Sequence, residues 1–372
     1  MPDLAERLER GRPGRAADPG PAGAGSGRRL WARLGAAGAL RGIYREGLPE
    51  RGVLPDRLGD LIVRAEAQED AGAVLSVCVQ AATVLPLLAQ AGRRGPAAAD
   101  VARRMLDGRC VVALAATDSG PGSDLTALTT HVEETDAGPV LRGSKRWITN
   151  AVHADLLLVL ARRRPGPHFT HFTWYLVPAD DPRVHVEAAE GPYFTGSGTG
   201  HIGLDGVPVL AGEPVGGAGR GLALFARHIA VERLAGGLWA AAVCRRALAD
   251  TRDRLARRGL WEQPAIRQRL AGALVRTRQL EALVKVSGSA VAAEHDHSGA
   301  ALVKAAAGET AEHVLGVCAH LCGADGFAAA GMQHRRAQAA LFGIAGGSTE
   351  TVLGSVADQA QALLARPGGV AW

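Results

Sequence analysis

The segment RWITN, Arg146–Asn150, places an indole and a hydroxyl two residues apart in a chain of 372 residues with only six Trp. The pattern predicts the end of a β-strand, where Trp147 and Thr149 point to one face because strand side chains alternate. A flat ring beside a small hydroxyl suits either the cap of a sheet or the wall of a planar ligand site. Taken alone, the segment favours the cap.

A second segment, LAATDSGPGSDL, combines glycines and hydroxyl side chains at the end of a predicted strand. Gly120 and Gly122, with the hydroxyls of Thr117 and Ser123, predict a turn whose backbone N–H groups approach a ligand closely. An ordinary Gly-Pro turn explains the same residues. Because the segment lacks both the strand–GxGxxG–helix context and the lysine of a P-loop, neither of those phosphate sites is predicted.

The composition is that of a globular protein, with 47% apolar and 21% charged residues. The net charge is +5, carried mostly by arginines scattered among acidic residues, with the densest run at Arg162–Arg164. No arginine cluster is interleaved with aromatic residues, so nucleic-acid binding is not predicted. The modest basic excess suits an anionic substrate or an acidic carrier protein.

The cysteines and the N-terminus bear on metal binding and location. Five cysteines without regular spacing argue against a secreted disulfide framework. Cys318 and Cys322 lie near His313 and His320, but no second ligand pair exists at a suitable spacing, so no metal is predicted. The opening MPDLAERLER lacks the apolar region of a signal peptide, and no uninterrupted run of about 18 apolar residues indicates a transmembrane helix. We therefore expect a cytoplasmic protein without membrane contact.

The order of patterns along the chain predicts an α+β fold with helices, then strands, then helices. The segment Ala71–Gly92 is apolar almost all round, which marks a buried helix that Pro86 should interrupt. Residues 1–10 suit a short helix. The predicted parts are a flexible N-terminal segment over 1–29, a helical domain over 30–108, a β-domain over 109–212 and a four-helix bundle over 213–372.

Taken together, the two opening segments and this order resemble the acyl-CoA dehydrogenase family of flavoproteins. That family carries a T-E-P-G-x-G-S-D turn, here Thr117–Asp124, followed by a W-I-T-N strand. GHIGLDGVPV resembles the family's V-x-F-D-x-V-x-V-P segment, with Leu204 in the Phe position. GGSTE, Gly346–Glu350, resembles the closing G-T-x-E-I. The resemblance covers roughly residues 30–365, and four motifs in order are more specific than any one of them.

The resemblance implies FAD as cofactor. Trp147 and Thr149 would flank its isoalloxazine, with Thr149 hydrogen-bonding near N5. Ala116, Thr117 and Ser123 would contact the flavin through backbone and hydroxyl groups.

The resemblance also assigns substrate contacts to Ser123, Ser197 and Arg233. Ser197 matches the position that meets the pantetheine–phosphate arm in the family. A solvent-exposed serine in the Gly-rich loop FTGSGTG explains that residue equally well.

The family's chemistry needs a carboxylate base for the carbon next to a thioester carbonyl. Many members place a Glu where this chain has Gly346, whose N–H can still serve the carbonyl. Other branches place the base on an earlier helix directly before an Arg, and here Glu232 precedes Arg233. A surface ion pair is the alternative role for Glu232.

The rest of the cofactor site departs from the family pattern. The resemblance places Ser348 and Glu350 of the closing motif at the cofactor, although a structural role explains Glu350 and Asp118 better. The family's R-x-x-F-G-x-P-I-x-x-x-Q appears without its F-G pair and with Gln268 displaced. The Q-x-x-G-G-x-G-[YF] segment appears as HLCGADGF, with His320 for Gln and Gly323 retained. These residues would hold the adenine end of FAD, in a manner that differs from the family.

The resemblance implies an FAD-dependent dehydrogenase acting on CH–CH groups of an acyl thioester, carried by CoA or by an acyl carrier protein. The Arg-rich composition suggests bacterial acyl or secondary metabolism, polyketide biosynthesis included. The alternatives are desaturation at the γ,δ position of an already unsaturated thioester, a flavin monooxygenase or oxidase on the same fold, or an inactive partner protein without flavin. The implied partners are an electron-transfer flavoprotein as acceptor and further copies of the chain in a homodimer or homotetramer.

Overall fold

A computed structural model gives the conformation of most of the chain. Segment 1–24, with the short helix expected over 1–10, lies outside the described residues, as does Ser123. The described residues are 25–93, 95–120, 122, 124–209 and 214–365.

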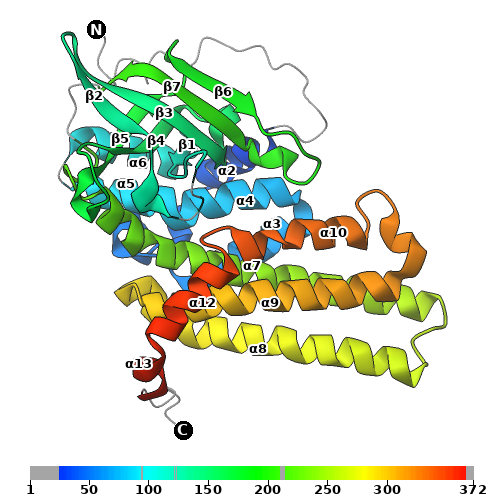
Figure 1. The fold of residues 1–372 in the computed structure, drawn as a ribbon. Helices are drawn as coiled ribbons and strands as arrows, with labels where there is room; N and C mark the ends of the chain where they lie inside the picture. The colour runs from blue at the N-terminus through cyan, green and yellow to red at the C-terminus, as the bar shows by residue number, and fades with distance from the viewer. Residues whose placement is uncertain (1–24, 94, 121, 123, 210–213, 366–372) are drawn as a thin grey trace. The chain divides into compact units, whose positions relative to one another are not determined.

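Residue contacts divide the chain into two compact units, which we call unit 1 and unit 2. Unit 1 holds the residues up to Val53 together with Glu69–His228, and unit 2 holds Leu54–Gln68 and the chain from Ile229 onward. Figure 1 labels the helices and strands of both. The boundaries of the three predicted domains stay a prediction.

A seven-stranded sheet forms the centre of unit 1. Its order is β1-β4-β2-β3-β7-β6, with β5 paired to β4. The β1–β4 pair is parallel, whereas β2–β3, β3–β7, β4–β5 and β6–β7 are antiparallel. The strands are β1 Val112–Ala115, β2 His131–Thr135, β3 Gly138–Ile148, β4 Leu156–Arg162, β5 Phe172–Pro178, β6 Val184–Ala188 and β7 Gly200–Pro208.

The apolar face of the sheet explains which strands the sequence reveals. β4 and β5 are buried along almost their whole length and form the core with the inward residues of β1, β3 and β7. β2 and β6 were not predicted. They are short, mostly exposed and contain charged residues, so they lack the apolar run that marks a strand.

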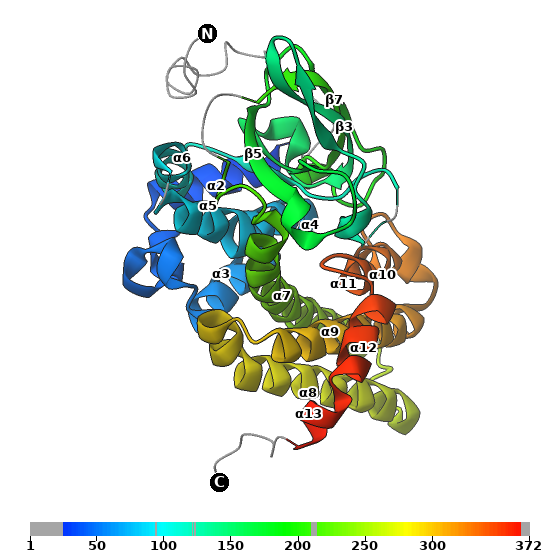
Figure 2. The ribbon, with the colours of Figure 1, turned by 60° about the vertical axis from the view of Figure 1, so that its left-hand side comes forward.

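Among the described residues of unit 1, four α-helices precede the sheet, and in Figures 1 and 2 helices α4 and α5 run below the strands. A π-helical turn, Gln80–Val84, separates α4 from α5. Pro86 is the second residue after this turn and has no N–H to donate, which explains why the α-helical ladder breaks here as predicted. The helices are α2 Ser26–Ala36, α4 Ala71–Val79, α5 Leu85–Gly92 and α6 Pro96–Leu106.

The same helical segment qualifies the expectation about membranes. Ala71–Gly92 is long and apolar enough to cross a bilayer, with a mean hydropathy of 1.9, although polar residues interrupt its sequence. Since 83% of its most apolar window is buried inside the protein, the segment has the character of a core helix.

Long helices dominate unit 2. In Figure 2 α7, α8 and α9 run side by side. They pack closely, because a Cβ at Gly237 of α7 would lie 2.4 Å from the Val303 side chain of α9 and 3.1 Å from that of Val284 on α8. The helices are α3 Pro55–Gln68, α7 Gly221–Arg257 (whose first turns belong to unit 1), α8 Pro264–Glu294, α9 His297–Cys322, α10 Met332–Ala339, α11 Leu341–Ile344, α12 Thr349–Asp358 and α13 Ala360–Ala365.

The predicted order of helices, strands and helices is confirmed, and with it the α+β class. The fourth predicted bundle helix differs, because residues 334–343 belong to two short helices, α10 and α11. Both pack on α9 rather than extending along it as one long helix.

Candidate active site

In unit 1, the turn that follows β1 is bonded to the end of β3. The Thr117 hydroxyl donates to the Arg146 carbonyl at 2.9 Å, and the Arg146 N–H donates to the Thr117 carbonyl at 3.1 Å. Ala116 is buried, and its carbonyl accepts a hydrogen bond from Lys145 at 3.0 Å. The Thr117–Asp124 turn and the RWITN segment therefore lie against each other.

A buried ion pair anchors this junction. The Lys145 ammonium is inaccessible to solvent and donates to Asp118 at 2.6 Å and to the Leu160 carbonyl at 2.7 Å. Burial raises the pKa of Asp118, but Lys145 and the hydrogen bonds from Thr130 outweigh it and hold that pKa below its usual range. Burial lowers the pKa of Lys145 to about 8, against the opposing effect of Asp118. The structural role expected for Asp118 is confirmed.

The predicted strand end is found at the end of β3, but it is irregular, and the shared face of Trp147 and Thr149 stays a prediction. Lys145 pairs with Ile202 and Ile148 pairs with Gly200, so two residues of β3 oppose one residue of β7. This is a β-bulge, which re-aims the side chains at its position. Trp147 itself has φ +56°, a left-handed conformation that is rare for a bulky residue.

The bulge presents the Trp147 ring outward, with 67% of the residue exposed. The indole meets the His201 ring edge to face, with centroids 5.1 Å apart and planes at 90°. The backbone N–H of Trp147 donates to His201 Nδ1 at 3.2 Å. Thr149 follows the last residue of β3 and is half-buried. A flat aromatic surface held this way is a wall on which a planar ligand can stack.

Asn150 and Ser197 connect the same strand end to its surroundings. Asn150 is buried and left-handed, and it bonds through its side chain to Ser76 and through its N–H to the Ser197 carbonyl. Ser197 is only 1% exposed, so the alternative of a solvent-exposed serine is wrong. Its hydroxyl donates to the Phe194 carbonyl at 2.6 Å, inside its own turn. Its contact with substrate stays a prediction.

In unit 2, the predicted base lies beside the position where other family branches carry theirs. A Cβ built on Gly346 would come within 4.0 Å of Glu232 Oε1 and 3.7 Å of Arg233 Cγ. Arg233 Nε donates to the Gly346 carbonyl at 3.0 Å. Gly346 has φ +74°, which suits glycine and disfavours a side chain. Glu232 is half-buried in α7 and points into the space that a residue-346 side chain would enter.

Lys304 of α9 completes this cluster. Its Cε lies 3.9 Å from the same Cβ position, and its ammonium donates to the Phe342 carbonyl. Burial and the charge of Arg233 lower the pKa of Lys304 to about 8, while Glu350 opposes the shift. Burial likewise lowers the pKa of Arg233, and the Glu232 carboxylate opposes it. One carboxylate and two cations thus surround the Gly346 backbone.

The closing motif begins helix α12. Ser348 is its N-cap, and its hydroxyl accepts the Thr351 N–H at 3.3 Å. Glu350 lies exposed in the first turn, where its own N–H and Ser348 lower its pKa. These contacts show a structural role for both residues, and their contact with a cofactor stays a prediction.

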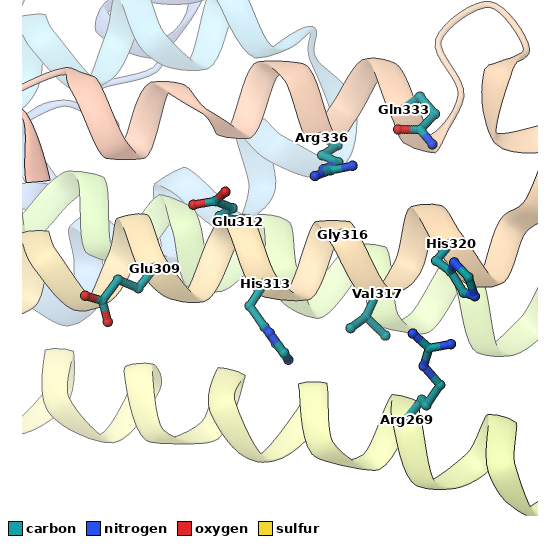
Figure 3. Close-up of a pocket in the computed structure, with 9 residues that line it drawn as sticks. All are labelled: Arg269, Glu309, Glu312, His313, Gly316, Val317, His320, Gln333 and Arg336. Atoms are coloured by element: carbon teal, nitrogen blue, oxygen red, sulfur yellow. The ribbon is translucent and has the colours of Figure 1, made fainter.

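A polar pocket of about 650 Å³ opens on the bundle among α8, α9 and α10. Figure 3 shows Arg269 of α8 near His320, and Arg336 of α10 on the opposite side of α9, where its Nε lies 3.9 Å from a Cβ built on Gly316. His320 lines the pocket as one of the predicted adenine-end residues, Gln268 directly precedes Arg269, and Gly323 ends α9 with φ +59°. The remaining lining residues are Glu309, Glu312, His313, Gly316, Val317 and Gln333.

Within the described ranges, no group of three or more His, Cys, Asp or Glu side chains is arranged to hold a metal ion. Cys318 and Cys322, weighed above as ligands, are buried in α9.

Sequence reasoning missed three participants. His201 lies in GHIGLDGVPV, whose strand pattern and family resemblance gave this histidine no role, and the bulge that brings it to Trp147 leaves no sequence signal. Lys304 is one of only three lysines in an arginine-rich chain, which is the signal that could have singled it out. Arg336 belongs to an Arg pair on a polar helix, and only the packing of α10 shows which arginine faces the pocket.

These features define a class: a protein with a sheet that exposes an aromatic wall and a helical unit that holds a carboxylate beside a Gly-Gly turn. Comparison with known proteins gives the family. The acyl-CoA dehydrogenase middle domain matches residues 113–207, and the acyl-CoA dehydrogenase C-terminal domain matches residues 219–361. The chain belongs to the acyl-CoA dehydrogenase family of oxidoreductases.

Among curated proteins, the chain is similar to the acyl-[acyl-carrier-protein] dehydrogenase MbtN of Mycolicibacterium paratuberculosis, with 29% identity over 61% of this chain and 60% of that protein. It is also similar to a probable short/branched chain specific acyl-CoA dehydrogenase of Dictyostelium discoideum, 33% identical over 32% of this chain and 29% of that protein. The chain thus matches about three fifths of the length of the MbtN relatives.

Solved structures show the same fold. An acyl-CoA dehydrogenase from Geobacillus kaustophilus superposes with a TM-score of 0.81 at 19% identity, covering 96% of this chain and 92% of that one. The FAD complex of PigA superposes with a TM-score of 0.80 at 18% identity, covering 90% and 89%. The predicted architecture of N-terminal helices, central sheet and C-terminal helices is therefore that of the acyl-CoA dehydrogenases, and structures of this fold hold FAD.

Proposed function

We propose that the protein is an FAD-dependent dehydrogenase of acyl thioesters, with Glu232 as the base. The observation that carries the proposal is the 4.0 Å approach of Glu232 Oε1 to the side-chain position of Gly346. A carboxylate from α7 therefore reaches the space that a residue-346 carboxylate would reach. In this proposal Glu232 supplies the base that a glutamate at residue 346 supplies in other branches of the family.

The residues of unit 1 fit a flavin ring. Trp147 offers a large exposed aromatic face on a backbone held by Thr117, and Thr149 lies two residues further along the chain. Aromatic walls hold planar ligands by stacking at little entropic cost, because an indole has few rotatable bonds. With FAD bound, the cofactor would accept the hydride equivalent that the substrate releases. Ala116, Thr117, Ser123, Trp147 and Thr149 are the residues proposed to contact it.

The residues of unit 2 would carry out the proton chemistry. Glu232 takes the proton from the carbon next to the thioester carbonyl and becomes a carboxylic acid. The Gly346 N–H, oriented because Arg233 holds the Gly346 carbonyl, donates to the thioester oxygen as negative charge develops there. Half-burial of Glu232 in α7 restricts the access of water to its carboxylate.

Two observations support the substrate class. Acyl-CoA and acyl-carrier-protein dehydrogenases act on thioesters, and the similar MbtN proteins are acyl-[acyl-carrier-protein] dehydrogenases by name. The cationic pair Arg233 and Lys304 lies beside the proposed base, where positive charge stabilises an enolate. We therefore propose an acyl thioester on CoA or on an acyl carrier protein, desaturated at the α,β position.

The test is anaerobic bleaching of the flavin by a panel of acyl-CoA and acyl-carrier thioesters. Bleaching by a saturated thioester supports the proposal, and bleaching only by a 2-enoyl thioester would assign the γ,δ position instead. In Glu232→Gln the bleaching rate should fall by about 100-fold or more, the usual contribution of a general base, while FAD stays bound.

Glu294→Gln is the matched control, because it removes an exposed carboxylate at the end of α8. Unchanged bleaching in Glu232→Gln would move the base to another residue. A colourless protein that binds no added FAD would contradict the proposed function, although the fold assignment would still hold.

The remaining expectations are part of this proposal. An electron-transfer flavoprotein would reoxidise the reduced flavin, and slow reaction of that flavin with air would separate a dehydrogenase from an oxidase or monooxygenase. We also propose a homo-oligomer located in the cytoplasm.

A further inference from the structure

The Trp147 bulge is held by two different residues of unit 1. On one side Thr117 bonds both the carbonyl and the N–H of Arg146. On the other side the Trp147 N–H, which the bulge removes from the regular ladder, donates to His201 Nδ1 at 3.2 Å. His201 is also the single residue of β7 that faces the two bulged residues of β3, Arg146 and Trp147.

The conformation at Trp147 needs this support. A left-handed φ of +56° on an indole-bearing residue is strained, and such strain persists only where neighbours enforce it. The T-shaped contact with the His201 ring adds an aromatic pair to the hydrogen bond. One side chain thus fixes both the backbone and the ring of the exposed wall.

The hydrogen bond requires a particular state of the imidazole. Nδ1 accepts a hydrogen bond from the backbone N–H of Trp147, so it carries no hydrogen itself. The neutral ring therefore holds its proton on Nε2. Protonation converts both ring nitrogens into donors and removes the acceptor. Histidine is the side chain whose charge changes between about pH 5 and 8.

Charged groups of both signs surround His201. Glu187 of β6 lies directly across the ladder, with His185 two residues away on the same face. Arg146 belongs to the bulge on β3, and His153 ends the short helix Ala151–His153 next to the start of β7.

We propose that His201 is a positioning residue for the aromatic wall, whose neutral Nδ1 holds Trp147 in the bulge and whose protonation releases it. The inference rests on the proposed function in one respect, because it makes flavin affinity depend on the state of His201. It adds a residue to which the family resemblance assigned no role.

The test uses the full-length protein labelled with fluorotryptophan, with and without added FAD. The Trp147 resonance is assigned by its loss in Trp147→Phe and followed by fluorine NMR between about pH 5 and 8. In the wild type it should move in a single one-proton step. His201→Asn keeps an acceptor near the δ position without a titrating group, so its Trp147 resonance should stay at the high-pH position.

His201→Ala removes the acceptor and should hold the resonance at the low-pH position. His185→Ala is the control, because it removes a histidine from the same face while leaving His201 in place. FAD should bind about fivefold more weakly to His201→Ala at high pH, as expected for one lost hydrogen bond. Wild-type affinity should fall by a similar factor on acidification, and that of His201→Asn should not.

A Trp147 resonance that titrates in His201→Asn as in the wild type would overturn the inference. So would a His201→Ala protein whose resonance matches the high-pH wild type. If Trp147 titrates through His201 but no variant binds FAD, the proposed function fails and the holding role of His201 stands. If FAD binds equally well to all variants at every pH, the proposed function stands and the effect on affinity fails.

Discussion

Individual charges in unit 1 act very differently according to burial. The side chains of Lys145 and Asp118 are both inaccessible to solvent. The Lys145 ammonium donates to Asp118 and to the carbonyls of Ala116 and Leu160, and the Asp118 carboxylate also accepts the Thr130 N–H. Arg142, three residues earlier on β3, forms an exposed network with Glu133 and Asp205. The same strand therefore carries one structural ion pair and one solvated one.

We predict that Lys145→Met destabilises the protein by about 3–5 kcal/mol, because it leaves the Asp118 carboxylate buried without its counter-ion. Arg142→Met is the matched control and should cost less than about 1 kcal/mol, as exposed pairs do. Urea unfolding measures both. Equal losses in the two variants would contradict the special role of the buried pair.

The pair also makes stability depend on pH. The pKa of Asp118 is lower in the folded than in the unfolded chain, so its contribution is present above the unfolded pKa of about 4. It is lost as the pH falls through the folded-state pKa. The difference in the free energy of unfolding between the wild type and Lys145→Met should thus be constant near neutral pH and shrink in acid. A difference that grows in acid would contradict this sign.

At the scale of elements, the π-helical turn has a structural purpose. It presents the buried Gln80 side chain to the edge strand β1. The Gln80 amide donates to the Val112 carbonyl and accepts the Val112 N–H at 3.3 Å, as a neighbouring strand would. A single side chain thereby satisfies two backbone groups that would otherwise lie buried and unpaired.

We predict that Gln80→Met costs about 2–4 kcal/mol, because both backbone groups of Val112 lose their partners in a buried site. Amide exchange at Val112 should accelerate beyond what the global loss of stability explains. Ser76→Ala, one turn earlier on α4, breaks a bond to Asn150 and should leave exchange at Val112 unchanged relative to the rest of β1. Accelerated exchange of all of β1 in both variants would argue against this local role.

Elements with a strong apolar period could be predicted from the sequence, because their burial follows their hydrophobicity. The buried strands β4 and β5 are of this kind, the long helices α7, α8 and α9 follow from their length and their Ala- and Leu-rich composition, and the break at Pro86 follows from proline chemistry. β2 and β6 depend on pairing with neighbours rather than on their own pattern. No local rule announces such tertiary pairing.

The residues of the proposed site likewise fall into two groups, those that the sequence identifies and those that only the structure places. Glu232, Gly346 and Trp147 were identified because motifs carry them. The bulge at Trp147, the approach of His201 and the burial of Lys304 arise from register and packing between distant segments. A one-residue shift in strand register decides which side chain faces Trp147, and the sequence of β3 does not contain that information.

At the scale of the whole molecule, each unit carries its own part of the proposed chemistry. Unit 1 carries the residues proposed for the flavin ring, and unit 2 carries the base and the polar pocket. We propose that Arg269, His320 and Arg336 hold the diphosphate and adenine end of FAD, since arginines suit phosphate through charge-assisted hydrogen bonds. Because the F-G pair of the family motif is missing, the arginines would supply what that motif lacks.

This assignment predicts that the protein distinguishes FAD from FMN, which has the same ring but no adenylate. Any ligand that binds only the folded state stabilises it, by about 2.7 kcal/mol at a hundredfold excess over its dissociation constant. FAD should therefore raise the unfolding temperature more than FMN at equal concentration. Arg269→Gln combined with Arg336→Gln should lower the FAD shift to that of FMN and leave the FMN shift unchanged.

The control for charge is Arg257→Gln combined with Arg276→Gln, which removes two exposed arginines that do not line the pocket. Both double variants lose the same net charge, so a nonspecific electrostatic effect would weaken FAD equally in both. Equal shifts for FAD and FMN in the wild type would mean that no adenylate site exists. A full FAD advantage in the pocket variant would place that site elsewhere, because FAD differs from FMN by the adenylate that this pocket is proposed to hold.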